Sequence, residues 1–146
     1  MNLQRIVVIG AGTMGSGIAQ WFAQQMCDVE LVDNSEEQLK KALAGIHSSW
    51  DKLVEKEKLT SCQVNQMKRL LEIKSLNQVS PNADLVIEAI IENLKIKHQL
   101  FSLLDKVCPS ETLFASNTSS ISIKEIAEPV TRKDKFGGLH FFNPGN

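Results

Sequence analysis

The run Gly10-Ala11-Gly12-Thr13-Met14-Gly15 offers the first chemistry in the sequence, because it has the spacing G-x-G-x-x-G. It follows a β-branched run at 5–9 and opens a segment of helical periodicity that begins at Thr13. In that context the first glycine permits a tight turn, the second lets backbone approach a pyrophosphate, and the third lets the helix pack closely on the strand. The amino end of the helix adds unpaired N–H groups and roughly +0.5 charge. The run predicts a dinucleotide-phosphate site.

An acidic partner for this loop is expected about 20 residues further on, at the end of the second strand. Asp33 lies 23 residues after Gly10, at the end of the run Val-Glu-Leu-Val-Asp. Its carboxylate can accept hydrogen bonds from a ribose 2′-OH and would repel a 2′-phosphate, and Asn34 beside it carries no positive charge. These residues favour NAD over NADP. The competing interpretation is a glycine-rich turn followed by a solvated strand-end aspartate.

Strand and helix patterns alternate along the whole chain. Buried-strand patterns cover 5–9, 29–33, 84–91, 112–116 and 136–142, with a weaker candidate at 72–74. Alternation of this kind is typical of a parallel sheet with helices on both faces, and right-handed crossovers then give a doubly wound Rossmann order. We therefore expect an α/β fold with a mostly parallel sheet.

The helices expected between these strands are defined by their apolar spacing. Met14, Ile18, Trp21, Phe22 and Met26 form one face of the first. The next begins after a cap at Asn34 or Ser35 and reaches at least Val54, and a helix at 59–71 folds back on it to make a long hairpin. A later helix carries Ile96, Leu100, Leu103, Leu104 and Val107, and a short one covers 123–127.

The composition of the chain limits the classes of function that we expect. The 146 residues suit one domain, taken as 1–146, and 16 basic against 17 acidic residues leave a net charge of −1, which does not favour nucleic-acid binding. No apolar run approaches the ~20 residues of a membrane helix, and we expect no secretion signal, because residues 1–5 lack its pattern. Cys27, Cys62 and Cys108 are scattered, so we expect reduced thiols, no metal site and a cytoplasmic location.

Three further motifs follow the glycine loop in order: Ile87-Glu88-Ala89-Ile90-Ile91-Glu92-Asn93-Leu94-Lys95, Ser116-Asn117-Thr118-Ser119-Ser120 and His140-Phe141-Phe142-Asn143-Pro144. With these motifs the chain closely resembles the N-terminal NAD-binding half of the L-3-hydroxyacyl-CoA dehydrogenases, including the 3-hydroxybutyryl-CoA enzymes. The resemblance covers essentially the whole chain. It implies oxidation of a 3-hydroxyacyl-CoA to a 3-oxoacyl-CoA by hydride transfer to NAD, in fatty-acid or butanoate metabolism.

The resemblance also implies roles for single residues. His140 matches the general acid/base that takes the proton from the 3-hydroxyl, a task suited to an imidazole. Ser119 matches a serine near the substrate hydroxyl and the nicotinamide ribose, and Asn143 an asparagine beside the catalytic histidine. Glu92 and Lys97 match residues that line the NAD site, and Ala89 is assigned to the same site. Glu88 is expected to be a structural strand-end group, and Ser116 and Ser120 to be turn or cap hydroxyls.

Ser49 and Lys56 match positions that touch coenzyme A in the family. They are seven residues apart, which puts them two turns apart on one line of a helix, with Lys52 between them. That line flanks the apolar stripe of the helix and can border a groove. His47 and His98 are expected to be surface or partly packed residues.

The resemblance implies two features beyond Asn146. Family members carry a glutamate about a dozen residues after the catalytic histidine, and a helical domain that closes over the substrate and generally forms a homodimer. We therefore expect the 146-residue chain to bind NAD with little or no turnover. Two alternatives stay open: a dinucleotide-binding module without turnover, and a related Rossmann dehydrogenase acting on hydroxy acids or sugar acids.

Overall fold

The computed structural model describes residues 3–80, 82–118 and 120–139. Within them six strands form one sheet, in the order β3-β2-β1-β4-β5-β6, and every strand pairing is parallel. This is the doubly wound order expected from the alternation. The strands are β1 (Arg5–Ile9), β2 (Asp28–Val32), β3 (Leu71–Lys74), β4 (Leu85–Glu88), β5 (Leu113–Ser116) and β6 (Phe136–Gly138).

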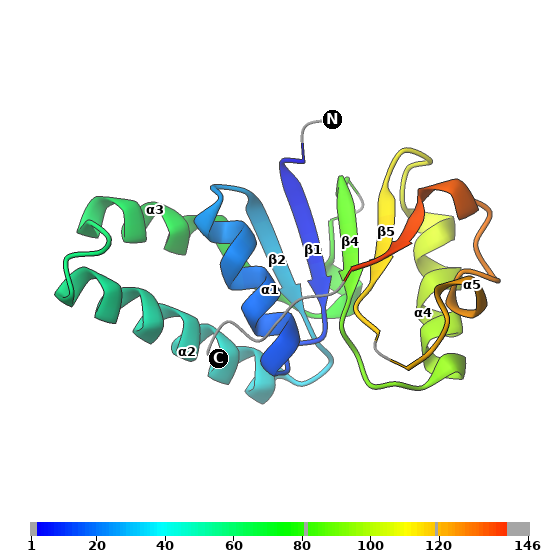
Figure 1. Cartoon of the computed structure of the whole chain (residues 1–146), viewed down its shortest axis with the longest axis horizontal. Coiled ribbons are helices and arrows are strands. Elements are labelled where there is room, and N and C mark those ends of the chain that lie inside the picture. Colours follow the sequence, from blue (N-terminus) through cyan, green and yellow to red (C-terminus); the bar gives the residue numbers. More distant parts are fainter. Residues whose placement is uncertain (1–2, 81, 119, 140–146) are drawn as a thin grey trace.

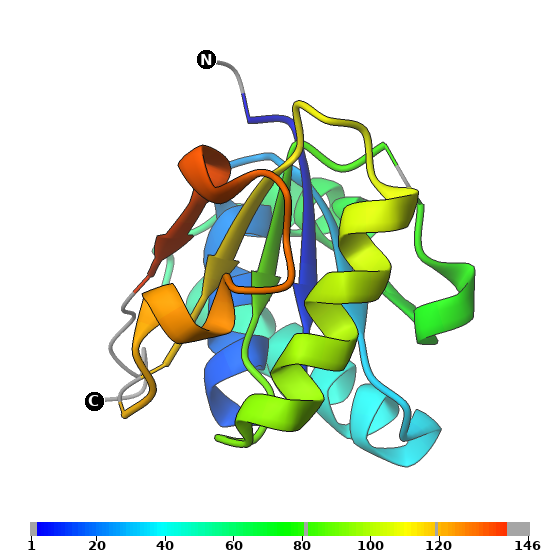
Figure 2. The same ribbon diagram turned by 90° about the vertical axis from the view of Figure 1, so that its right-hand side faces the viewer.

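Helices cover both faces of this sheet (Figure 1). One face carries α1 (Thr13–Gln24), α2 (Glu36–Glu55) and α3 (Ser61–Leu70), and the other carries α4 (Leu94–Val107) and α5 (Ile123–Ile126). Short 3₁₀ turns lie at Leu76–Gln78 and Lys133–Lys135. Figure 2 shows α4 lying across the sheet, opposite the face that α1 covers. The predicted layers are confirmed.

Alternating side chains of β1 divide the core into two layers. Ile6 and Val8 pack with α1, α2 and α3, whereas Val7 and Ile9 pack with α4 and α5. All four side chains are at most 5% exposed, as expected for a central strand of a parallel sheet. Trp50 of α2 is fully buried in the first layer, and its indole N–H donates to the side-chain oxygen of Gln24 at 3.0 Å.

The helical hairpin after β2 is confirmed, and its caps explain its bounds. Ser35, one of the two residues predicted as the cap, accepts the backbone N–H of Gln38 at 3.1 Å. Thr60 and Gln63 form a capping box at the start of α3. The helix predicted around Ile96 is α4, which begins at Leu94 because Asn93 caps it by accepting the N–H of Ile96. The strand predicted at 84–91 ends at Glu88.

The predicted apolar face of α1 is partly wrong. Ile18 and Phe22 are buried, but Trp21 is 47% and Met26 is 39% exposed. Glycines and alanines replace them against the sheet, because α1 lies too close to β1 for a large side chain at every turn; Gly15, Gly17, Ala19 and Ala23 are all buried. The apolar spacing predicted helix α1 correctly, but it overestimated the width of the face that α1 buries.

Candidate cofactor site

The glycine loop leaves β1 at the carboxyl edge of the sheet and is fixed there through Ala11. The Ala11 N–H donates to the Asp33 carboxylate at 2.9 Å, and the Ala11 carbonyl accepts from the side-chain amide of Gln38 at 2.8 Å. The second oxygen of Asp33 accepts the N–H of Ser35, also at 2.9 Å. Asp33 therefore joins the loop to the start of α2, and its oxygens retain lone pairs for a further donor.

The three glycines of the motif meet three different surroundings. Gly10 has a φ of +112°, which favours glycine, and a Cβ on Gly15 would lie 1.6 Å from the Gly10 carbonyl oxygen. A Cβ on Gly12, in contrast, would meet nothing within 4 Å. Gly10 and Gly15 thus serve the turn and the packing that the motif predicts, while the space over Gly12 is open.

Helix α1 begins beside that space without a side-chain cap. Gly12 is its N-cap, and its first turn holds no acidic residue. The amides of a first helical turn have no partner within the helix, so these donors face the open space over Gly12. Uncapped amides, a helix dipole and an unobstructed approach together fit the pyrophosphate of a dinucleotide.

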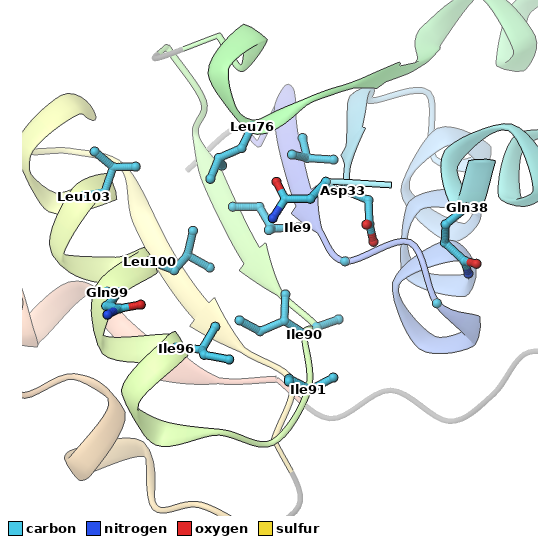
Figure 3. Close-up of a pocket in the computed structure, with 15 residues that line it drawn as sticks. Ile9, Asp33, Gln38, Leu76, Ile90, Ile91, Ile96, Gln99, Leu100 and Leu103 are labelled. Atoms are coloured by element: carbon cyan, nitrogen blue, oxygen red, sulfur yellow. The ribbon is translucent and has the colours of Figure 1, made fainter. Parts of the chain in front are cut away.

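A cleft of about 670 Å³ opens from the glycine loop towards α4 (Figure 3). Asp33 and Gln38 stand on its α2 side, and Leu100 and Leu103 on its α4 side. Its floor is apolar where β1 and β4 end, which suits the flat face of a nucleotide base. The lining residues are Ile9, Gly10, Gly12, Val32, Asp33, Asn34, Gln38, Leu76, Ala89, Ile90, Ile91, Ile96, Gln99, Leu100 and Leu103.

The cleft accounts for apolar residues of α4 that lie outside the core. Ile96 is 39% and Leu103 is 47% exposed, although both belong to the stripe expected to be buried. They line the cleft instead, together with Ile91, which is 68% exposed. Val107 belongs to the same stripe, but it is 53% exposed and lies neither in the core nor in the cleft. The stripe therefore combines a core face and a binding wall.

A buried network of charged and polar side chains lies at the carboxyl ends of β4 and β5. Glu88 and Lys97 form an ion pair with both side chains at 0% exposure. The Ser116 hydroxyl and the Ile90 N–H, the latter at 2.8 Å, also donate to the Glu88 carboxylate. Glu88 is thus the structural strand-end group that the sequence indicated. Ser116 is not the turn or cap hydroxyl predicted, because it ends β5 next to Glu88 and is fully buried against it.

Glu92 extends this network to the loop after β5. Its carboxylate accepts Lys97 at 3.1 Å and the hydroxyls of Thr118 and Ser120 at 2.6 and 2.7 Å. Burial alone would raise the pKa of Glu92, but these donors outweigh it and lower the pKa to about 2. Glu92 therefore stays ionised and ties the β4–α4 loop to the β5–α5 loop.

The residues predicted to bind cofactor fall into separate places. Gly10, Gly12, Asp33 and Ala89 line the cleft. Ala11 and Thr13 line a neighbouring groove between α1 and α2, with Gly12 at the border of both. Gly15 is buried under the loop, and Met14 is half-buried in the first turn of α1. Lys97 lies fully buried in the ion-pair network, so its contact and that of Glu92 with NAD stay predictions.

The predicted coenzyme A residues lie on α2. Ser49 lines the groove between α1 and α2, where its hydroxyl accepts the side-chain amide of Gln20 at 3.2 Å. Lys56 is the exposed C-cap residue of the same helix. The predicted catalytic residues Ser119, His140 and Asn143 lie outside the described residues. Sequence reasoning missed Gln38, whose position three residues after the cap Ser35 brings its side chain back to the loop.

Two features of the described residues bear on other sites. In residues 3–80, 82–118 and 120–139, no helix is long and apolar enough to cross a membrane. In the same ranges, no three histidine, cysteine or acidic side chains cluster as metal ligands would. The cysteines at 27, 62 and 108 are free thiols.

Comparison with known proteins agrees with the site. Residues 5–146 match the family model of the 3-hydroxyacyl-CoA dehydrogenase NAD-binding domain. The chain belongs to this family. Family membership supports NAD as the cofactor for which the glycine loop and Asp33 are arranged, and it confirms the resemblance carried by the four motifs.

Several relatives of this family are close in sequence and in structure. Hydroxyacyl-coenzyme A dehydrogenase of Homo sapiens mitochondria is 45% identical over 97% of the chain, and 3-hydroxyadipyl-CoA dehydrogenase of Escherichia coli is 44% identical over 99%. The crystal structure of an Escherichia coli 3-hydroxybutyryl-CoA dehydrogenase matches with a TM-score of 0.95 at 43% identity and 99% coverage. The chain spans 47%, 30% and 30% of the lengths of these three relatives.

Proposed function

We propose that this domain holds NAD for the oxidation of a 3-hydroxyacyl-CoA to the 3-oxoacyl-CoA. The single observation that carries the proposal is the unobstructed space over Gly12, bordered by an uncapped helix and by the Asp33 carboxylate. Family membership supplies the reaction class, because relatives that match nearly the whole chain are named for acyl-CoA substrates. Bound NAD supplies the hydride acceptor.

Different residues of the chain bind the cofactor, exclude water from the cleft and hold the neighbouring loops. Backbone amides at the start of α1 bind the pyrophosphate, and Asp33 accepts the hydroxyls of the adenosine ribose while holding the loop through Ala11. Ile96 and Leu103 exclude water from the apolar wall of the cleft. The Glu88–Lys97–Glu92 network holds the β4–α4 and β5–α5 loops in place on the other side of the edge.

His140 is the proposed general base. Its imidazole removes the proton from the substrate 3-hydroxyl as hydride leaves the carbon, and Asn143 positions the imidazole or the substrate carbonyl. Ser119 contacts the same hydroxyl and the nicotinamide ribose. These three assignments rest on the H-F-F-N-P and S-N-T-S-S motifs. Ser49 and Lys56 are proposed to contact the coenzyme A part of the substrate.

The protein at its natural length is proposed to act as a homodimer, by resemblance to the family. A cytoplasmic location is proposed, and the mitochondrial matrix if the protein comes from a eukaryote, since relatives include mitochondrial enzymes. Analytical ultracentrifugation and cell fractionation test these two points. A monomer at micromolar concentration would contradict the first, and a membrane-bound or secreted protein the second.

Calorimetric titration with NAD and NADP tests the cofactor assignment. The wild-type chain is expected to bind NAD at least about tenfold more tightly than NADP, since an extra phosphate beside Asp33 meets like charge. Asp33→Ala removes the repulsion together with two loop hydrogen bonds, so the NAD affinity should fall and the NAD/NADP ratio should approach one. Equal affinities for the two cofactors in the wild type would contradict the role of Asp33.

Acetoacetyl-CoA-dependent oxidation of NADH, measured on the protein at its natural length, tests the reaction. We expect His140→Gln to lower the rate at least about 10²-fold while leaving the NAD affinity within about twofold. A His140→Gln variant that keeps the wild-type rate would remove His140 from the mechanism.

A further inference from the structure

Three helical turns of this chain start with the same pattern, a serine or threonine followed three residues later by a glutamine. The pairs are Ser35 and Gln38 at α2, Thr60 and Gln63 at α3, and Ser75 and Gln78 at the 3₁₀ turn that follows β3. In a capping box the glutamine side chain accepts the backbone N–H of the capping residue. Gln63 accepts the Thr60 N–H in this way at 2.9 Å, and Gln78 accepts the Ser75 N–H at 3.1 Å.

The glutamine at the start of α2 departs from this pattern. The Ser35 N–H donates to the Asp33 carboxylate at 2.9 Å, so the cap is completed without the Gln38 side chain. The side-chain amide of Gln38 donates instead to the Ala11 carbonyl in the glycine loop, at 2.8 Å. Figure 3 shows Gln38 and Asp33 together on the α2 side of the cleft. Asp33 thus replaces Gln38 at the cap, and Gln38 contacts the loop.

The peptide between Ala11 and Gly12 is the group that Gln38 restrains. Its carbonyl also accepts the Ser16 hydroxyl, at the longer distance of 3.2 Å. Because the peptide is followed by a glycine, steric hindrance alone does little to stop it from turning over. Because the peptide is planar and trans, its N–H points opposite to its carbonyl. A carbonyl held by Gln38 of α2 therefore directs the Gly12 N–H away from α2.

The Gly12 N–H is a free donor within residues 3–80, 82–118 and 120–139, where it has no hydrogen-bond acceptor. It lies beside the uncapped first turn of α1, under the open space over Gly12. An anion in that space is attracted by an N–H and repelled by a carbonyl oxygen. The orientation of this one peptide therefore affects how well the loop binds phosphate.

We propose that Gln38 is a positioning residue for the cofactor, which holds the Ala11 carbonyl towards α2 so that the Gly12 N–H is presented to the pyrophosphate of NAD. The proposal rests on the cofactor site proposed above and adds a residue of α2 to it. Gln38 acts through the peptide between Ala11 and Gly12. The exchange of partners at the α2 cap makes this possible, because Asp33 takes the Ser35 N–H that Gln38 would otherwise accept.

Gln38→Met tests the role, because methionine has a similar length and no amide donor. The affinity for NAD, measured by calorimetric titration, should fall about three- to tenfold, as expected when a charge-assisted hydrogen bond is weakened. The affinity for ADP should fall by the same factor, since ADP keeps the pyrophosphate. The affinity for adenosine, measured by NMR titration, should stay within about twofold, because adenosine has no phosphate. The Gly12 amide resonance of the free protein should shift.

Gln63→Met is the matched control, because Gln63 occupies the same position at the start of α3. It should bind NAD within about twofold of the wild type. The Thr60 amide resonance should shift in this variant, because Thr60 loses its acceptor. The Ser35 amide resonance should keep its position in Gln38→Met, because its acceptor is Asp33. Equal losses of NAD affinity in the two variants would overturn the role of Gln38.

The outcomes separate this proposal from the cofactor site on which it rests. Binding of NAD and ADP by Gln38→Met with wild-type affinity overturns the role of Gln38 and leaves the cofactor site standing. Equal losses of affinity for ADP and adenosine also overturn it, because they show a disturbance of the whole cleft. No binding of NAD by the wild type overturns both proposals.

Discussion

The carboxyl edge of the sheet has two sides, one at the ends of β1 and β2 and the other at the ends of β4 and β5. Different kinds of residues form these two sides. The β1–β2 side is lined by glycines and helix amides, with an open space over Gly12. The β4–β5 side is filled by Glu88, Lys97 and Ser116, whose polar atoms already have partners. The first side leaves donors for an anionic ligand to satisfy. On the second side the charged and hydroxyl groups satisfy one another, and they join two loops.

The largest effect is expected from Gly15→Ala, on the β1–β2 side. The added Cβ would lie 1.6 Å from a backbone oxygen of Gly10, and neither α1 nor the loop can move away without breaking the close packing. We expect the chain to lose its cooperative thermal transition, as followed by circular dichroism. Gly45→Ala is the control and should unfold cooperatively, because its Cβ meets nothing within 4 Å. A stable, cooperative Gly15→Ala variant would contradict the account of the turn.

Lys97→Met tests the β4–β5 side. It leaves the Glu88 carboxylate buried without its cation, which costs on the order of 3 kcal/mol in unfolding free energy. Urea denaturation measures the loss, and the double variant Glu88→Gln, Lys97→Met should recover part of it. Lys40→Met, which breaks an exposed pair, should cost less than about 0.5 kcal/mol. Equal losses from the two lysines would mean that burial of the network contributes nothing.

Gly12→Ser separates binding from stability at the glycine loop. Serine is at least as good an N-cap as glycine, so the unfolding temperature should stay the same or rise slightly. The side chain would fill the open space and compete for first-turn amides, so we expect the NAD affinity to fall at least about tenfold in a calorimetric titration. Unchanged NAD affinity with unchanged stability would show that the phosphates bind elsewhere.

The smallest effect is a pH dependence at Glu92. Its pKa in the folded chain, about 2, lies below its ordinary value of 4.5, so its ionised form stabilises the fold above pH 4.5, and this contribution is lost as the pH falls from 4.5 towards 2. Glu92→Gln should therefore be less stable than the wild type at pH 7, and the difference should shrink at pH 3. Urea denaturation at both pH values measures it, and a difference that grows on acidification would contradict the assigned contacts.

Sequence reasoning was accurate where a pattern reflects the backbone. The glycine spacing, the position of Asp33 and the alternation of strand and helix gave the loop, its acidic partner and the sheet order, because each depends on local geometry. It was inaccurate where burial depends on distant neighbours. Trp21 shares the helical spacing of Ile18 yet remains 47% exposed, and Leu103 lines a cleft although its spacing indicates a core position.

The charge network was beyond prediction from spacing alone. Lys97 is nine residues after Glu88, and the two side chains meet only because α4 folds back across the end of β4. Ser116 joins them from β5, 28 residues further along the chain than Glu88. The resemblance to the dehydrogenase family selected Lys97 and Glu92 as important, but it did not indicate that Lys97 is buried.

An NMR titration of the ¹⁵N-labelled chain with NAD tests the central claim most directly, because it reports on the two sides of the sheet edge at once. The account predicts large shifts of the Gly12, Thr13 and Met14 amides, together with Asp33, and small shifts of the buried Lys97 and Ser116 amides. Shifts that leave the first turn of α1 unchanged at saturating NAD would contradict the claim that this loop holds the cofactor.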